Sequence, residues 1–215
     1  MKMPICSLLL TCAALTIPLS APADCGGACR GACGDPAAAA SATAPAGKLS
    51  RAEARHLLLM QDEEKLARDV YNAFAKKWAL RPFENIGTRS EPAHLAAVTD
   101  LLERYEVRMT PQPAEAGAFR SPDMKKLYDQ LIAQGSASAE AALKVGAEIE
   151  ELDIKDLREG AARARNEEVR TVYRNLEEAS IRHLNAFHRN LTARGVTYTP
   201  KHLDAATFRG LVEDR

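Results

Sequence analysis

One short pattern occurs twice in this chain of 215 residues and decides the fold that the chain can adopt. A glutamate is followed two residues later by leucine and seven residues later by tyrosine or leucine, in Glu64-Lys65-Leu66-Ala67-Arg68-Asp69-Val70-Tyr71 and Glu150-Glu151-Leu152-Asp153-Ile154-Lys155-Asp156-Leu157. A later stretch in each half carries a histidine, His94 or His183, and the histidines are almost as far apart as the glutamates. A helix pair used twice, each copy turning a carboxylate and an imidazole inward, can build a buried two-metal site.

The composition favours helices and argues against some classes of partner. Ala, Leu, Glu, Arg and Lys are abundant, and these residues are good helix formers. The length suffices for one sizeable core, so we expect a single folded domain. Lys and Arg number 29 together, as do Asp and Glu, so neither nucleic acid nor an anionic membrane is expected as the main partner.

The N-terminus has the features of a secretory signal peptide. Lys2 precedes the apolar run Ile5 to Leu19, and Ser20-Ala21-Pro22-Ala23 supplies the small residues of a cleavage site. We therefore expect residues 1–23 to be removed and the protein to be exported to a bacterial periplasm or secreted. The apolar run is shorter than the about 20 residues of a stable membrane anchor, so no membrane span is expected after cleavage.

Residues 24–49 are expected to form a flexible segment that contains three cysteines. Cys25, Cys29 and Cys33 are regularly spaced in a stretch rich in Gly and Ala, which cannot bury itself. An odd number of cysteines in an oxidising compartment favours a disulfide with a spare thiol, or a tether to another chain. A thiolate site for metal trafficking is the alternative.

From residue 50 onward the sequence predicts helices, and no segment alternates like a strand. Ser50-Arg51-Ala52-Glu53 is a capping box, and the first helix is expected to run from it to about Trp78. The further helices are expected at about Thr88 to Tyr105, Pro122 to Gln134, Ser138 to Ala164 and Asn166 to Arg194, with Gly195 as the terminator.

These ranges predict an all-α protein. The expected architecture is an antiparallel four-helix bundle over residues 50–195, with a short extra helix between the second and third long helices. Residues 196–215 are expected to form a C-terminal tail. The inward stripe of the first helix is predicted to comprise Leu58, Leu59, Leu66, Val70, Tyr71 and Phe74.

Each long helix offers a candidate metal ligand at the edge of its apolar stripe. Glu91 and His94 are three residues apart and therefore share a face. Glu64, Glu150 and His183 occupy similar inward positions on the other three helices. Unpaired carboxylates are rarely buried without a cation, and carboxylate with imidazole suits iron or manganese.

Each candidate also has a structural explanation. Glu63 and Glu64 could form a solvated pair, and Glu150 stands among other acidic residues, some of which must face water. His183 could be a core histidine bonded to a backbone carbonyl. The matched spacing in the two halves favours metal binding over these explanations. The remaining histidines are interpreted as structural or surface residues: His56, His188 and His202.

Four segments in combination resemble the DUF2202 family of the ferritin-like superfamily: residues 64–71, Ser90-Glu91-Pro92-Ala93-His94, residues 145–154, and His183-Leu184-Asn185-Ala186-Phe187. The resemblance covers about Leu57 to Leu191. It implies a rubrerythrin-like di-iron centre, with a Glu from each of two helices and Glu-x-x-His from each of the others. On this sequence it implies Glu64, Glu91 and His94 as ligands in the first half, and Glu150 and His183 in the second.

Two positions depart from the complete pattern. Ser180 stands where the second motif would have a glutamate, which leaves a second iron short of one anionic ligand. Asp153, three residues after Glu150 and on the same helix face, could supply the missing carboxylate, whereas Glu177 or Glu178 could do so only with distortion of the helix. A single-metal site or a weakened two-metal site is therefore the alternative to a complete di-iron centre. Pro92 lies inside the first motif and requires a place in the first turn of its helix.

Two functions follow from these observations. In the first, the exported bundle binds iron or manganese and performs oxidase- or peroxidase-type chemistry. In the alternative, it is a non-catalytic binding or stress module with a degenerate metal site, and the cysteine-rich segment makes the interactions. The sequence identifies neither substrate nor electron donor, and it is compatible with a homodimer.

Deleting residues 24–47 is expected to leave the thermal melt of the helical domain unchanged, because this segment has too few apolar residues to join a core. Circular dichroism at 222 nm, recorded on the mature and truncated proteins, measures the difference. A large drop in Tm for the truncated protein would show that the folded domain begins earlier than residue 50.

Overall fold

The computed structural model describes residues 47–213 of the chain. The expected signal peptide and the three cysteines at 25, 29 and 33 lie outside the described residues. Within residues 47–213 every regular element is helical, which confirms the all-α prediction. The elements are α1 (Arg51–Trp78), α2 (Arg81–Asn85), the π-helical turn η2 (Ile86–Ser90), α3 (Glu91–Arg104), α4 (Pro122–Gly135), α5 (Ala139–Arg163), α6 (Glu167–Thr192) and α7 (Ala205–Glu213).

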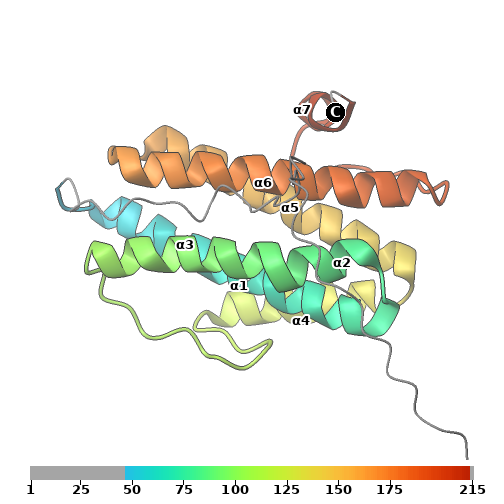
Figure 1. The fold of residues 1–215 in the computed structure, drawn as a ribbon, viewed down its shortest axis with the longest axis horizontal. Coiled ribbons are helices and arrows are strands. Elements are labelled where there is room, and N and C mark those ends of the chain that lie inside the picture. The colour runs from blue at the N-terminus through green and yellow to red at the C-terminus, as the bar shows by residue number, and fades with distance from the viewer. Residues whose placement is uncertain (1–46, 214–215) are drawn as a thin grey trace, which may run out of the picture. The chain divides into compact units, whose positions relative to one another are not determined.

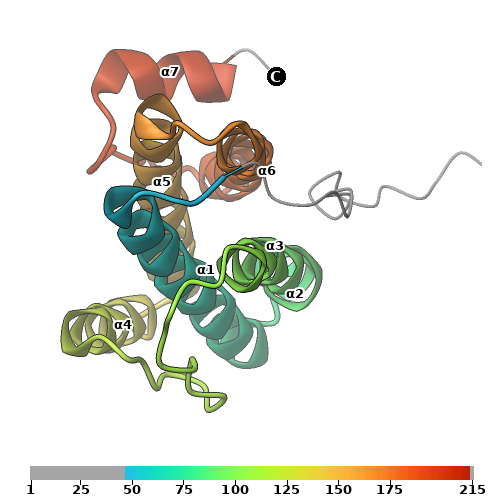
Figure 2. The same cartoon turned by 90° about the vertical axis from the view of Figure 1, so that its left-hand side faces the viewer.

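Four long helical segments pack side by side: α1, the continuous run of α2, η2 and α3, α5, and α6. α1 contacts α3 and α5, and α6 contacts α5 and α3. Figure 1 shows that each of these four segments runs antiparallel to the segments of the group that it contacts. α4 packs outside this group against α1 and α5, and α7 packs on α6, as the end view in Figure 2 shows.

Side-chain caps set the starts of four of these helices. Ser50 forms the predicted capping box with Glu53 at the start of α1. Ser121, Ser138 and Asn166 each accept a hydrogen bond from a backbone amide in the first turn of α4, α5 and α6. The expected bounds of these four helices are confirmed within two residues.

The second long helix begins earlier than predicted. The expected start at Thr88 is wrong. Pro82, a residue that can also end a connection between helices, lies in the first turn of α2, where the N–H that proline lacks would have no helical partner. The helix then widens into η2, in which the Glu91 amide bonds to the Ile86 carbonyl five residues back. Pro92 follows directly, in the first turn of α3.

Gly87 brings this π-helical turn close to α1. A Cβ atom at Gly87 would lie 2.9 Å from the Cβ of Tyr71, closer than side chains approach one another. Glycine is therefore required here for the backbone of η2 to pack against α1. The contact places Ser90 and Glu91 over the interior of the helix group.

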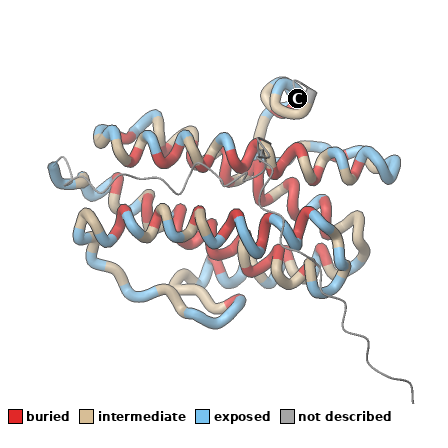
Figure 3. The backbone as a smooth tube through the Cα atoms, viewed as in Figure 1, coloured by how far each residue is buried: buried red, intermediate tan, exposed pale blue. Residues whose placement is uncertain are grey.

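Two apolar clusters fill the interior and leave a buried polar layer between them. One cluster includes Tyr71, Phe83 and Phe187, and the other includes Met60 and Leu101. Along α1 the clusters are separated by the buried polar residues 61–65, and α5 carries the buried acidic residues 150, 151 and 153 near the end of the first cluster. Figure 3 shows the buried stripes facing one another across the long helices.

The register of α1 differs from the predicted stripe at one position. Leu59 is 39% exposed, whereas Leu57 and Met60 are fully buried. The consecutive residues Leu57, Leu58 and Leu59 cannot share one helix face, because each residue is rotated by about 100° from the one before it. The burial of Met60 and Glu64 selects Leu57 as the inward member of the three.

The segment after α6 packs on the domain through a buried carboxylate. Gly195 ends α6 with a φ of +69°, as expected for a terminator. Glu151 is fully buried and accepts hydrogen bonds from the Tyr198 hydroxyl at 2.5 Å and from the backbone amides of residues 201, 202 and 203. This carboxylate therefore anchors the loop that leads to α7, a helix that the sequence analysis did not predict.

Among the described residues, none of the helices combines the length and apolar character that crossing a bilayer requires.

Glu53 joins the start of α1 to the start of α6. Its carboxylate accepts hydrogen bonds from the backbone amides of Ser50 at 2.9 Å, Arg165 at 2.8 Å and Asn166 at 3.0 Å. Burial by itself would raise the pKa of Glu53, but these hydrogen bonds outweigh it and lower the pKa from 4.5 to about 2.

Replacing Glu53 by glutamine is expected to destabilise the fold by about 1–3 kcal/mol near neutral pH, because charge-assisted bonds to three amides are weakened. The folded pKa lies below the unfolded value, so this contribution is complete above about pH 4.5 and is lost as the pH falls toward 2. Urea denaturation at several pH values measures the difference in unfolding free energy between the wild type and Glu53→Gln, and Glu103→Gln, at an exposed position, is the control. A difference in unfolding free energy that stays constant down to pH 2 would contradict this account.

Candidate metal centre

Five side chains proposed as ligands from the sequence meet in the buried polar layer. α1 contributes Glu64, α3 contributes Glu91 and His94, α5 contributes Glu150, and α6 contributes His183. Four of them are at most 1% exposed, and His183 is 8% exposed. The tertiary structure thus brings together residues that are more than one hundred positions apart in the chain.

The two histidines share one glutamate. His94 Nδ1 lies 3.3 Å from Glu64 Oε2 and 3.4 Å from Glu91 Oε2. His183 Nδ1 lies 3.2 Å from Glu91 Oε1 and 3.5 Å from Glu150 Oε2. The imidazole rings are stacked with centroids 5.4 Å apart. Glu91 is therefore central, and each of its oxygens faces a different histidine.

The polar atoms that converge here lack hydrogen-bond partners. Of nine such buried side-chain atoms in the described part of the chain, seven belong to this cluster: both oxygens of Glu64, both of Glu91, Oε2 of Glu150, and Nδ1 of His94 and of His183. Buried polar atoms are normally satisfied, and leaving one unpaired costs about 1–3 kcal/mol. A group of buried ligand-type atoms that make no hydrogen bonds is typical of a metal-binding site.

Two residues that the sequence analysis did not assign to the site orient its ligands. The Ser90 hydroxyl lies 2.9 Å from Nε2 of His183 and 3.3 Å from Nε2 of His94, so both Nδ1 atoms turn toward the carboxylates. The Tyr71 hydroxyl donates to Glu150 Oε1 at 2.6 Å. Ser90 stands beside Glu91, and Tyr71 is the last residue of the first repeat. Their positions within the quoted motifs were the signal that could have identified them as residues of the site.

The histidines and the central glutamate stabilise one another's charged forms. Burial alone would lower the pKa of each histidine, but the carboxylates of Glu91, Glu64 and Glu150 raise the pKa of His94 well above its usual range and that of His183 to about 9. Burial alone would raise the pKa of Glu91, and the two imidazoles hold it well below its usual range instead.

The surrounding carboxylates outnumber the imidazoles. Burial raises the pKa of Glu64 to about 7, although His94 opposes this shift. Burial also raises the pKa of Glu150. Asp153 is 2% exposed, and burial together with Glu64 and Glu150 raises its pKa well above its usual range. The region therefore holds more carboxyl groups than imidazoles, and a bound cation would neutralise the negative charge of the carboxylates.

Asp153 and Ser180 occupy the interior, as the sequence pattern indicates. Ser180 is 1% exposed, so the position that lacks a glutamate does face inward. Asp153 lies near Glu64 and Glu150, but the ligand atoms that approach within 4.8 Å of one another come from Glu91, His94 and His183. Among the described residues this is the group that could hold a metal ion.

Glu63 is buried, which was not expected. The alternative of a solvated Glu63–Glu64 pair is wrong, because the two residues are 3% and 0% exposed. Oε2 of Glu63 has no hydrogen-bond partner, and burial next to Asp156 raises the pKa of Glu63 well above its usual range. Asp156 itself pairs with Lys155 at 2.8 Å.

Comparison with known proteins identifies the family to which these residues belong. Residues 53–214 match the family model DUF2202, described as an uncharacterized protein domain. The chain belongs to the DUF2202 family. The match includes all five residues of the buried cluster and most of the described structure.

Another protein similar to this DUF2202 chain has a known structure. The uncharacterized protein MJ0754 of Methanocaldococcus jannaschii is 39% identical over 168 residues, which cover 78% of this chain and 90% of that protein. Its crystal structure matches with a TM-score of 0.78 at 38% identity, over 81% of this chain and 99% of that chain. The helical fold of the DUF2202 domain is therefore shared with an experimentally determined structure.

Replacing Glu63 by methionine is expected to stabilise the metal-free protein by about 1–2 kcal/mol, because it removes a buried carboxyl that has an unpaired oxygen. Urea denaturation in the presence of a chelator measures the change, and Glu103→Met provides an exposed control. A loss of stability specific to Glu63→Met would show that this carboxyl makes a stabilising contact.

Proposed function

We propose that this DUF2202 domain is a ferritin-like four-helix bundle that binds iron or manganese in the buried Glu/His cluster. The observation that carries the proposal is the convergence on one buried region of seven ligand-type atoms that make no hydrogen bond. Carboxylate and imidazole donors form a hard-to-borderline set that suits these metals.

The helix arrangement supports the bundle. The four long helical segments run antiparallel to their neighbours, and the connection from α3 to α5, which contains α4, joins helices that are not hairpin partners. Each long segment contributes at least one side chain to the cluster. Ferritin-like proteins place their metal ligands on inward faces of facing helices in the same way.

The cluster suits two ions that share Glu91. Glu64, Glu91 and His94 would hold one ion, and Glu91, Glu150 and His183 the other. With neutral imidazoles, the four buried carboxylates of this region, including Asp153, would balance two divalent cations. Ser180 supplies no carboxylate on the second side, so we propose that the second ion is the more weakly bound.

The chain's own residues supply orientation and exclusion of water. Tyr71 fixes the carboxylate of Glu150, and Ser90 fixes both imidazoles; such supporting bonds commonly change metal affinity by about 10- to 100-fold. The apolar clusters on both sides keep the site dry. Bound iron or manganese would supply redox chemistry with dioxygen or peroxide. Export to the periplasm stays a prediction of the N-terminal sequence.

Metal content tests the proposal directly. The full-length protein, expressed with iron or manganese supplied and purified without chelator, is expected to contain up to two ions per chain by inductively coupled plasma mass spectrometry. Glu91→Gln and His94→Ala should each reduce the content to less than half, because both remove a ligand from the cluster. His202→Ala, on the exposed surface, is the matched histidine control.

Two outcomes would contradict parts of this proposal. A wild-type protein without iron or manganese, and with a Tm that neither metal raises, would exclude the metal centre. A protein that binds metal but neither consumes peroxide nor oxidises added Fe²⁺ would instead support a non-catalytic binding module.

A further inference from the structure

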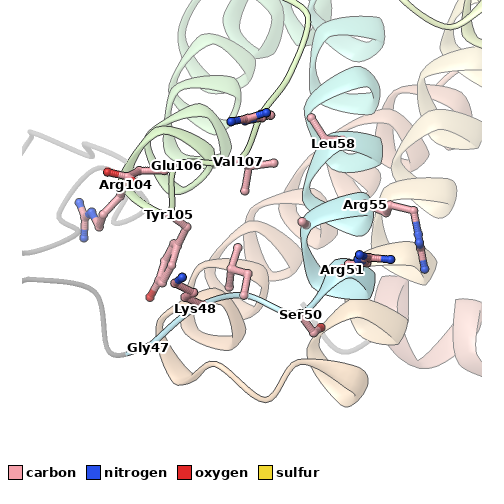
Figure 4. Close-up of a pocket in the computed structure, with 13 residues that line it drawn as sticks. Gly47, Lys48, Ser50, Arg51, Arg55, Leu58, Arg104, Tyr105, Glu106 and Val107 are labelled. Carbon is pink, nitrogen blue, oxygen red and sulfur yellow. The ribbon is translucent and has the colours of Figure 1, made fainter.

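A second candidate binding site lies where α1 begins and α3 ends. A cavity of about 790 Å³ opens there between the entry segment 47–50, the first two turns of α1 and the chain that leaves α3 (Figure 4). The volume is typical of pockets for small organic ligands. No residue of the Glu/His cluster lines this cavity, so the two sites are distinct.

The cavity is surrounded by cationic side chains. Lys48, Arg51, Arg55 and Arg108 line it, and within the described part of the chain none of these four side chains has a hydrogen-bond or ion-pair partner. Glu106 is an acidic residue of the same lining, so the cations outnumber it. The fifth cation, Arg104, pairs with Glu168. Since acidic and basic residues are equal in number over the whole chain, this is a local excess of positive charge.

One of these cations lies at the start of a helix. Arg51 is in the first turn of α1, where the helix dipole is positive and acidic residues are preferred. Glu53 is the acidic residue of the first turn, and its carboxylate is already engaged by three backbone amides. An anion bound beside Arg51 would interact favourably with its charge and with the helix terminus.

The interior of the cavity is apolar. Arg51, Ala54, Arg55 and Leu58 follow the i, i+3, i+4, i+7 spacing of one helix face, so the cations stand at the outer end and Leu58 lies further along the helix. Leu58 and Val107 pack against the apolar cluster that contains Met60 and Leu101. A ligand that fills this cavity therefore meets both a charged rim and an apolar wall.

One wall of the cavity is held in place by hydrogen bonds. The Tyr105 hydroxyl donates to Glu168 Oε2 at 2.7 Å and accepts from Asn166 Nδ2 at 2.8 Å. Asn166 also caps the start of α6. The tyrosine ring is thus fixed between α3 and α6, which gives the cavity a defined shape before any ligand binds.

We propose that this pocket binds an amphiphilic anion, with a phosphate or carboxylate group bound by the cationic side chains that line it and an aliphatic part against Leu58 and Val107. Arginine binds both groups through paired hydrogen bonds, which favours these anions over halide. The same chemistry is found in a free alkyl phosphate and in the headgroup region of an anionic lipid.

Binding of dodecyl phosphate below its micellar concentration tests the proposal. Isothermal titration calorimetry on the full-length protein is expected to give a dissociation constant that rises at least tenfold in the Arg51→Ala, Arg55→Ala double variant. The control is Arg174→Ala, Arg209→Ala, which removes two exposed arginines whose side chains make no hydrogen bond or ion pair within the described residues and line no part of this pocket. Dodecyl maltoside, which has the same tail without charge, should bind at least tenfold more weakly.

Vesicles distinguish the two sources of the ligand. If phosphatidylglycerol vesicles sediment the wild type but not the pocket variant, the ligand is a lipid headgroup; if only dodecyl phosphate binds, it is a free molecule. Both results support the pocket. Absence of binding to either, equal loss in the control variant, or equal affinity for the maltoside would overturn the proposal. Metal content should be unchanged in the pocket variant.

Discussion

The contact between Glu91 and two imidazoles is the interaction on which the interior of this protein depends. A carboxylate that is 1% exposed would be strongly unfavourable alone, and it is tolerated because His94 and His183 each face one of its oxygens. The same pairing holds two histidines that are 0% and 8% exposed. Glu64 and Glu150 complete the arrangement on either side, and they bring α1 and α5 into the same polar layer.

The rest of the fold is arranged to hold this layer in place. Apolar clusters lie on both sides of it along the four long helical segments. The π-helical turn places Ser90 beside both rings, and Gly87 allows that turn to approach α1. Local irregularity in the second long helix is thus a requirement of the site and not a defect in packing.

Much of the fold and most of the candidate site could be predicted from the sequence. Capping residues and apolar periodicity gave the bounds of α1, α4, α5 and α6, because these signals are local. The start of the second long helix was missed, since Pro82 is equally compatible with a loop and with a first helical turn. The burial of Glu63 and Glu151 was also missed, because neighbouring acidic residues look alike until their partners, such as the backbone amides of residues 201–203, are known.

The sequence by itself determined that the chain is helical, which residues bear ligand-type groups, and that the pattern repeats. These properties depend on spacing along one helix, which a linear pattern records. The tertiary structure decided that Glu91 lies between the two histidines, that Tyr71 and Ser90 orient the ligands, and that cationic side chains from α1 and from the chain after α3 line one cavity. Each of these depends on how separate helices approach, and that approach is set by packing of side chains distant in sequence.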